Sequence, residues 1–242
     1  MKTLVLGDIH GRTCWKNIIE IEQPDKIIFL GDYVSTHENI SEEQQISNLR
    51  EIMDYKIQNN DKVILLRGNH DMQHCGFAWA SFRSGLYWMV QKWLMENIDE
   101  FLDLTQWVHI EDNIIFSHAG ISKRWFKDSN FKSIEDINNS PVNCKFAFNG
   151  KFSDYTGISE TQPLTWIRPG TLVFCAIPDY IQVVGHTPVK TICNFTEFAK
   201  INYKPSIEET ELDFAPPIWC CDNLPKEYLV IEDKQFKVKN YE

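Results

Sequence analysis

The sequence of 242 residues contains no cluster of lysine and arginine and no long uninterrupted apolar run. Acidic residues outnumber basic ones by 34 to 24, which gives a formal net charge of −10. Because nucleic acids and anionic membranes attract basic surfaces, this charge argues against a protein that coats nucleic acid or lies on a membrane. A membrane-spanning helix needs about 20 apolar residues, and the first residues include no apolar segment of signal length. We therefore expect a cytoplasmic protein with no membrane partner.

Cysteine pairs separated by two residues, the spacing of common zinc and redox sites, are also absent. The chain has seven cysteines, and the adjacent Cys220 and Cys221 have poor geometry for an ordinary disulfide. We expect reduced, mostly buried thiols in a reducing compartment.

The chain does contain enough apolar material for a core, with 43% hydrophobic and 13% aromatic residues. This composition excludes global disorder, and the length fits one large α/β domain. We expect a single domain over residues 1–242. Two polar segments interrupt it, a cap-like excursion at 128–163 and an acidic surface loop at 196–217.

Strands and helices alternate in the first part of the chain. Short apolar runs at 3–6, 26–30 and 62–66 predict three strands. A helix is expected from Ser41, because Ser41 and Gln44 form a capping-box pattern ahead of apolar residues at helical spacing. Strands that alternate with helices pair in parallel, so all three strands should end at the same edge of one sheet.

Further apolar segments follow. Residues 82–98 predict another helix, and the apolar runs before His118 and His186 predict two more strands. The closing part of the chain predicts an antiparallel second sheet formed by residues 192–195, 219–221, 228–231 and 236–238.

Polar side chains follow the predicted strands where each strand ends. Carboxylate, amide and imidazole groups of this kind suit divalent metals such as Mn²⁺, Fe or Zn²⁺. Six of them would hold two ions about 3.5–4 Å apart with one carboxylate bridging, an arrangement that serves displacement at phosphorus. Asn69 can ligate while its neighbour His70 gives a proton to a leaving group. The full set is Asp8, His10, Asp32, Asn69, His70, His118 and His186.

Five motifs resemble the signature of the calcineurin-like metallophosphoesterases. They are closest to the branch that includes phosphoprotein phosphatases and symmetrical diadenosine tetraphosphatases. The resemblance implies an α/β fold, a two-sheet β-sandwich flanked by helices, with a dimetal site at the strand carboxyl ends. The motifs, in the family's order, are GDIHG (7–11), GDYV (31–34), GNHD (68–71), SHAG (117–120) and GHTP (185–188).

The same resemblance implies roles for single residues. It makes His70 the general acid, and it makes Arg67 and Arg168 phosphate contacts, for which ordinary surface ion pairs are the alternative. Asp32 bridges the two metals. One metal is assigned to Asp8, His10 and Asp32, and the other to Asp32, Asn69, His118 and His186.

The implied activity is hydrolysis of phosphate monoesters by a metal-bound hydroxide, as in serine/threonine phosphatases. The substrate is then a phosphorylated small molecule or a phosphoprotein. A diadenosine tetraphosphatase or another phosphodiester or phosphoanhydride hydrolase is the alternative within enzymes, because Trp79, Tyr155 and Trp166 offer aromatic walls.

One departure from the family pattern stands out. Protein phosphatases place Asp-Arg-Gly where this chain has Ser35, Thr36 and His37. The lost carboxylate leaves the orientation of His70 open, although His37 and His74 lie near enough in sequence to replace it. The departure also keeps a third possibility open, a non-catalytic, metal-stabilised phosphate-binding module.

Overall fold

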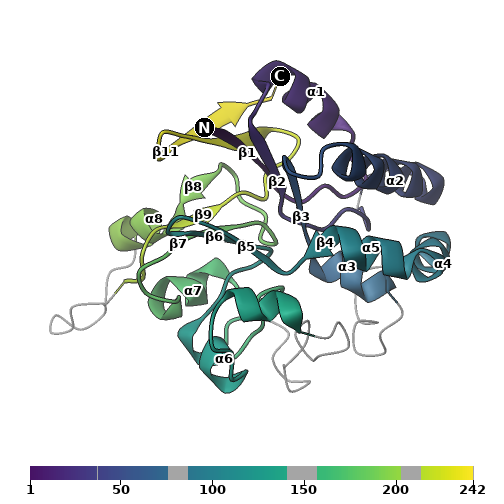
Figure 1. Ribbon diagram of the computed structural model, residues 1–242. Helices are drawn as coiled ribbons and strands as arrows, with labels where there is room; N and C mark the ends of the chain where they lie inside the picture. The colour runs from purple at the N-terminus through teal and green to yellow at the C-terminus, as the bar shows by residue number, and fades with distance from the viewer. Residues whose placement is uncertain (37, 76–86, 141–156, 203–213, 242) are drawn as a thin grey trace, which may run out of the picture.

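Two β-sheets form the centre of the protein (Figure 1). The computed structural model describes residues 1–36, 38–75, 87–140, 157–202 and 214–241. The first sheet has the strand order β11-β10-β1-β2-β3-β4, and the second has the order β5-β6-β7-β9-β8. The strands of the first sheet are β1 (Lys2–Leu6), β2 (Lys26–Phe29), β3 (Val63–Leu66), β4 (Thr105–Gln106), β10 (Glu227–Glu232) and β11 (Gln235–Asn240). Those of the second are β5 (Val108–Glu111), β6 (Ile114–Ser117), β7 (Ile181–Val184), β8 (Cys193–Asn194) and β9 (Ile218–Cys220).

Strands β1, β2 and β3 pair in parallel, as the alternation of strands and helices predicts. In the second sheet, β6 and β7 are also parallel. The carboxyl ends of each parallel set therefore lie at one edge of its sheet. These are the ends from which the motif residues follow.

The prediction for the closing strands is wrong for two of the four segments. Strand β10 pairs antiparallel with β1, and β11 pairs with β10, so both extend the first sheet. This pairing covers the edge of β1, which would otherwise expose unpaired backbone groups. Only β8 and β9 join the second sheet, which is mixed: the β5–β6 and β8–β9 pairs are antiparallel, and the β6–β7 and β7–β9 pairs are parallel.

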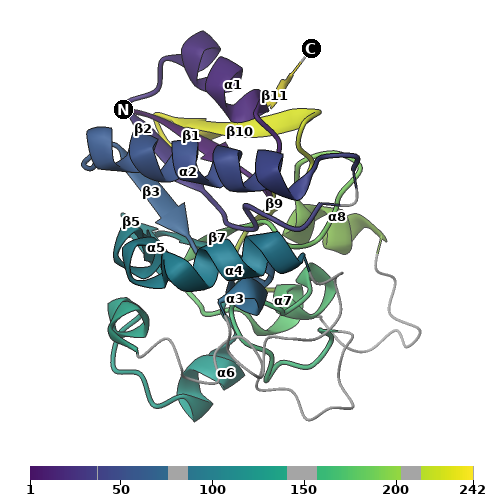
Figure 2. The ribbon, with the colours of Figure 1, turned by 90° about the vertical axis from the view of Figure 1, so that its right-hand side faces the viewer.

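Helices lie against both sheets. Figure 2 shows α1 and α2 across the strands of the first sheet, with α4 beside α2. Helix α2 has the predicted capping box between Ser41 and Gln44. The predicted helix at 82–98 is present as α4, and residues 82–86 lie outside the described residues. The helices are α1 (Cys14–Glu22), α2 (Glu42–Gln58), α3 (Asn69–His74), α4 (Trp88–Glu96), α5 (Ile98–Leu104), α6 (Lys123–Asp128), η1 (Glu135–Asn139), α7 (Pro169–Cys175) and α8 (Phe195–Asn202).

The two sheets share a core of apolar side chains. Ile28 and Leu66 from the first sheet are fully buried in one cluster with Val183 from the second. The half-buried rings of Trp219 and Phe236 stack with their centroids 4.9 Å apart, which links β9 to β11. Burial of these core side chains fixes the two sheet edges relative to each other.

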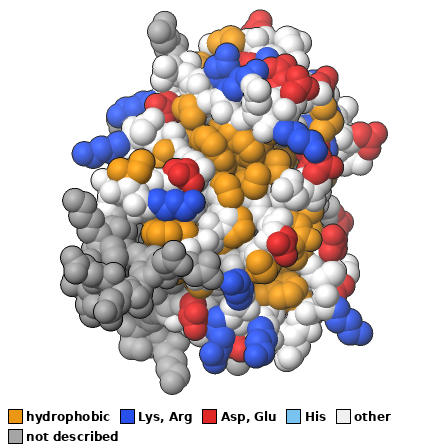
Figure 3. Space-filling view, turned by 90° about the vertical axis from the view of Figure 1, so that its left-hand side faces the viewer, with side chains coloured by type: hydrophobic (Ala, Val, Ile, Leu, Met, Phe, Trp, Pro, Cys, Tyr) orange, Lys and Arg blue, Asp and Glu red, His pale blue; other side chains and the backbone are white. Residues whose placement is uncertain are grey.

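Hydrophobic side chains also gather at the surface, on the side of the molecule where β8, β11 and α8 lie (Figure 3).

The two predicted polar excursions are described only in part. Residues 196–202 belong to α8, so the acidic loop is shorter than the sequence suggests, and residues 203–213 lie outside the described range. Of the segment 128–163, residues 141–156 lie outside it. The six cysteines within the described ranges are free thiols. Within those ranges, no helix is both long and apolar enough to cross a membrane.

Candidate active site

The turn after β1 is fixed to the turn after β2 by backbone hydrogen bonds. The N–H of His10 donates to the carbonyl of Asp32 at 2.7 Å, and the N–H of Gly11 donates to the carbonyl of Tyr33 at 2.8 Å. His10 and Asp32 both have positive φ angles, 47° and 52°. A non-glycine residue rarely adopts this backbone region, so the turns hold these side chains in an unusual direction.

A buried carboxylate that the sequence analysis did not single out joins the turns after β2 and β3. Asp71 accepts hydrogen bonds from the N–H groups of Asp32 at 2.8 Å, Tyr33 at 2.7 Å and Gly68 at 2.9 Å. Asp71 is the last residue of the motif GNHD, which was the signal available in the sequence. Through these bonds it sets the position of Asp32.

Two groups of possible metal ligands lie at the joined turns. Ligand atoms of Asp8, His10 and Asp32 lie within 4.8 Å of one another, and so do those of Asp32, His118 and His186. Asp32 belongs to both groups, as a bridging carboxylate would. The structure thus brings together the two predicted ligand sets.

The sixth predicted ligand, Asn69, lies in the second group. Its Oδ1 is 2.8 Å from Nε2 of His118 and 2.8 Å from Nδ1 of His186. The Nε2 atom of His186 is buried and has no hydrogen-bond partner among the described residues. A buried nitrogen of this kind is costly unless it meets a donor or a metal ion, so the donor set fits a metal.

The electrostatics of the cluster also favour bound cations. Burial and the nearby carboxylate of Asp222 raise the pKa of Asp8. Burial also raises the pKa of Asp32, but the attraction of His118 and His70 outweighs this effect and leaves the pKa below its usual value. Burial lowers the pKa of His118, but Asp32 and Asp8 outweigh it and raise this pKa to about 10. The carboxylates of Asp8, Asp32 and Asp222 lie close together, so an additional positive charge between them is favourable.

Asp222 is a second residue that the sequence analysis did not identify. It is buried and follows strand β9 by two residues, the same relation that Asp8 has to β1. Burial raises its pKa, as does the charge of Asp32, while His10 lowers it. The pattern of an acidic residue after an apolar strand was therefore present in the sequence at this position too.

His70 lies beside the first group of ligands. Its backbone N–H donates to Oδ1 of Asp32 at 2.8 Å, and its Nε2 is 3.9 Å from Oδ2 of the same carboxylate. Its ring meets the ring of His10 edge-on, with centroids 5.1 Å apart. Its side chain is 18% exposed, so it is accessible to a ligand at the cluster.

The two arginines differ in their surroundings. Nε of Arg67 donates to Oγ1 of Thr105, and Nη2 donates to the carbonyls of Leu102 and Thr105. These bonds hold the buried guanidinium against β4, next to β3, and the phosphate contact expected of Arg67 stays a prediction. Arg168 donates from Nη1 to the carbonyl of His186 at 3.3 Å and remains beside the cluster.

Ser35, at the position where the protein phosphatases have aspartate, contacts His74. Its Oγ lies 2.6 Å from Nε2 of His74, and both side chains are buried. Burial and the charge of His70 lower the pKa of His74 to about 4. Neutral His74 is therefore the hydrogen-bond partner of Ser35.

Of the other residues that the sequence analysis named, His37, Trp79 and Tyr155 lie outside the described residues.

The buried, neutral His74 predicts a loss of stability in acid. Its pKa is about 4 in the folded protein and about 6.5 when unfolded, so protonation favours unfolding. The free energy of unfolding should fall between pH 6.5 and pH 4, by up to about 3 kcal/mol from this residue. Urea titrations of the chelator-treated wild type and of His74→Gln at several pH values measure the contribution of His74. If the free energy of unfolding changed with pH by the same amount in both proteins, the assignment would be contradicted.

The close approach of Gly185 to Asp8 predicts a defect in metal binding. A Cβ atom at position 185 would lie 2.2 Å from Oδ1 of Asp8, whereas at Gly170 it would meet no atom within 4 Å. Gly185→Ala must therefore displace this carboxylate, and metal affinity should fall about 10- to 100-fold. Gly170→Ala is the matched control and should bind metal like the wild type in a calorimetric titration. Equal affinities in both variants would show that Asp8 is not a ligand.

Comparisons with known proteins agree with this geometry. The family model described as calcineurin-like phosphoesterase matches residues 1–203. A cold-active protein-tyrosine phosphatase from a Shewanella species is 15% identical, with a TM-score of 0.64, over 99% of this chain and 77% of that one. A protein serine/threonine phosphatase from Saccharomyces cerevisiae is 11% identical, with a TM-score of 0.63, over 100% and 80% of the two chains.

At these identities the solved structures establish similarity of fold, while the family model covers most of the chain. The match includes all six residues of the two ligand groups. The chain therefore belongs to the calcineurin-like phosphoesterase family, whose members are hydrolases that act on phosphoester bonds with divalent metal ions.

Proposed function

We propose that this protein hydrolyses phosphate monoesters with two divalent metal ions, in the manner of a serine/threonine phosphatase. The observation that carries the proposal is the position of Asp32, whose carboxylate belongs to both groups of ligand atoms. One metal would be held by Asp8, His10 and Asp32. The other would be held by Asp32, Asn69, His118 and His186.

The ligand set restricts which metals suit the site. It offers carboxylate, amide and imidazole groups and no thiolate among the described ligands, which fits Mn²⁺, Fe or Zn²⁺. Two such ions polarise phosphoryl oxygens and lower the pKa of water near the phosphorus atom.

The protein's own residues supply the other steps. His70 holds a proton at Nε2 for the oxygen of the leaving group, since its partly exposed ring lies beside Asp32. Arg168 offers N–H groups to the phosphate oxygens from the side of His186. Asp71 holds the backbone of Asp32 and keeps the shared carboxylate in place.

A substrate screen on the metal-loaded protein tests this proposal. The substrates are a phosphoserine peptide, p-nitrophenyl phosphate, bis(p-nitrophenyl) phosphate and diadenosine tetraphosphate, each also assayed with metal-free protein. We expect turnover of the two monoesters that depends on added Mn²⁺. Preferential turnover of the diester or of diadenosine tetraphosphate would contradict monoesterase activity. Binding of phosphate without any turnover would instead identify a binding module.

A further inference from the structure

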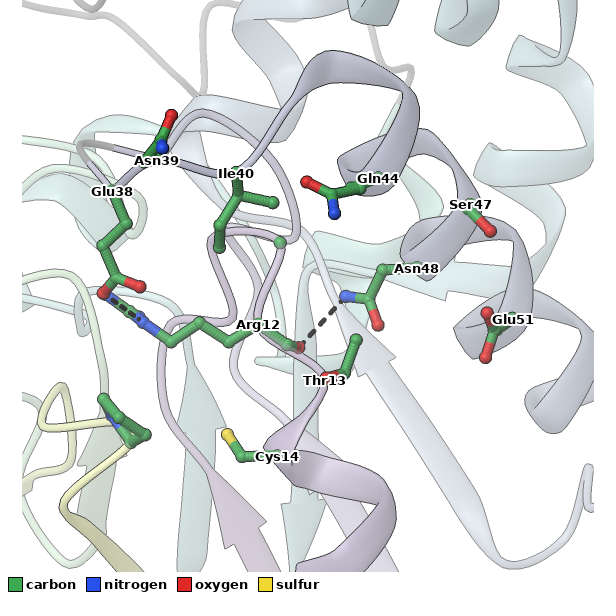
Figure 4. Close-up of a pocket in the computed structure, with 12 residues that line it drawn as sticks. Arg12, Thr13, Cys14, Glu38, Asn39, Ile40, Gln44, Ser47, Asn48 and Glu51 are labelled. Carbon is green, nitrogen blue, oxygen red and sulfur yellow. Dashed lines mark hydrogen bonds and ion pairs between the residues drawn. The ribbon is translucent and has the colours of Figure 1, made fainter.

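A pocket of about 500 Å³ adjoins the turn that carries the first metal ligands (Figure 4). Three segments line it: residues 11–14 at the start of α1, residues 38–40, and the first half of α2. Pro225 completes the wall. Cavities of about 300–1,000 Å³ accommodate small molecules, so the volume suits a ligand of that size.

The charged side chains of this pocket are neutralised by partners. Nε and Nη2 of Arg12 both lie 2.7 Å from Oε1 of Glu38. Glu51, on the opposite side in Figure 4, pairs with Lys16. Among the described lining residues, each charged side chain thus has a partner of opposite charge. A ligand in this pocket is expected to be neutral.

Several neutral hydrogen-bonding groups face the same space. Within the part of the chain that the structure describes, the side chains of Thr13, Asn39 and Ser47 make no hydrogen bond to protein. Gln44 uses its Oε1 in the capping box, which leaves its NH₂ group available. Figure 4 shows Gln44 projecting from α2 toward Ile40. Amides and hydroxyls both donate and accept, as a compound with several hydroxyl groups requires.

The pocket also has apolar surface, from Ile40 and Pro225. A sugar ring presents C–H groups on its faces and hydroxyls around its rim. Apolar contact for a face, with neutral donors and acceptors for the rim, matches this lining.

The pocket and the ligand cluster share one wall. Nη1 of Arg12, in the pocket, donates to the carbonyl of Asp8 at 3.2 Å. The intervening His10 is anchored to Asp32 through its backbone N–H. Arg12 therefore adjoins both the turn that carries Asp8 and the pocket.

We propose that this Arg12 pocket binds the neutral, hydroxyl-rich part of the substrate, a sugar or similar polyol, while the phosphoryl group lies at the Asp32 cluster. This inference rests on the proposed phosphomonoesterase function. It identifies the substrate class as small polyol phosphates in preference to phosphoproteins.

The inference can be tested with two alkyl phosphates, of which only one carries a polyol. Glucose 6-phosphate and ethyl phosphate both release a primary alcohol, so their chemical reactivity is similar. Two or three hydrogen bonds of about 1 kcal/mol each should make kcat/KM at least about 10-fold higher for glucose 6-phosphate than for ethyl phosphate. The ratio of kcat/KM for glucose 6-phosphate to kcat/KM for ethyl phosphate should fall about 10-fold in Ser47→Phe, a change at an exposed position. It should fall by a smaller factor in Asn39→Ala. Glu43→Phe, also exposed on α2 but outside the pocket, is the matched control and should preserve it.

A second measurement separates this inference from the proposed function. Binding of free glucose, followed by saturation-transfer NMR, requires no hydrolysis and should weaken in Ser47→Phe but not in Glu43→Phe. If the wild type hydrolysed both phosphates with nearly equal kcat/KM values, the inference would be overturned and the proposed function would remain. Glucose binding that depends on Ser47, without hydrolysis of either phosphate, would support the pocket's ligand class and refute the function.

Discussion

Replacing Asp32 with asparagine is expected to lower kcat by roughly 10³-fold or more, equivalent to about 4 kcal/mol in the barrier. The same change at Asp8 should cost about 10- to 100-fold. The difference follows from the geometry, because Asp32 contributes to both groups of ligand atoms and Asp8 to one. An amide retains one oxygen, but it has no negative charge and cannot join two cations in the same way.

The side chain of Asp32 also has a second task. Its Oδ1 accepts the backbone N–H of His70 at 2.8 Å, so its loss affects the position of the proton donor. Steady-state kinetics with p-nitrophenyl phosphate and metal analysis of each purified variant provide the test. Asp61→Asn, at an exposed position outside the five motifs, is the control and should behave as the wild type. Equal and mild losses for Asp8→Asn and Asp32→Asn would mean that Asp32 does not bridge.

The ligand cluster could be predicted from the sequence because its pattern is local. Each ligand follows an apolar strand within a few residues, and parallel pairing then brings the strand ends of each sheet together. Helix α2 was predictable for the same reason, since Ser41 and Gln44 form its capping box within four residues. A short-range signal was sufficient in both cases.

The remaining features depend on contacts between distant residues. Ser35 and His74 are 39 positions apart, and Arg67 and Thr105 are 38 apart. A single sequence does not show which side chains meet across such separations. The placement of β10 beside β1 is of the same kind, because either sheet offered an edge to which the closing strands could pair.

The phosphate contact that the resemblance implies for Arg67 stays a prediction, whereas the structure shows how this residue supports the fold. The residue directly precedes the GNHD motif, and the backbone carbonyls of Leu102 and Thr105 accept hydrogen bonds from its guanidinium. Burial lowers the pKa of Arg67 to about 10, which leaves the group charged at neutral pH and dependent on those acceptors. Removing it is thus expected to affect the stability of the β3–β4 pair before it affects substrate binding.

His70→Asn is expected to separate substrates by their leaving groups. For an alkyl phosphate, departure of the alkoxide needs a proton, and loss of a positioned acid should lower kcat about 10²- to 10⁴-fold. For p-nitrophenyl phosphate, the phenolate departs without a proton, and kcat should fall less than about 10-fold. The amide preserves part of the shape of the imidazole and the backbone bond to Asp32.

The measurement is kcat for ethyl phosphate and for p-nitrophenyl phosphate in the wild type and in His70→Asn, with metal content determined in both proteins. His109→Asn, a change on strand β5, is the matched control because it removes an imidazole outside both ligand groups. Equal losses on the two substrates would show that His70 acts on binding or on the metal ligands rather than on the leaving group. Unchanged kcat on ethyl phosphate would assign the proton to another group. Since His74 is bonded to Ser35 and neutral down to a pH of about 4, that group would have to be a different residue at the cluster, and Asp222 would be the next to replace.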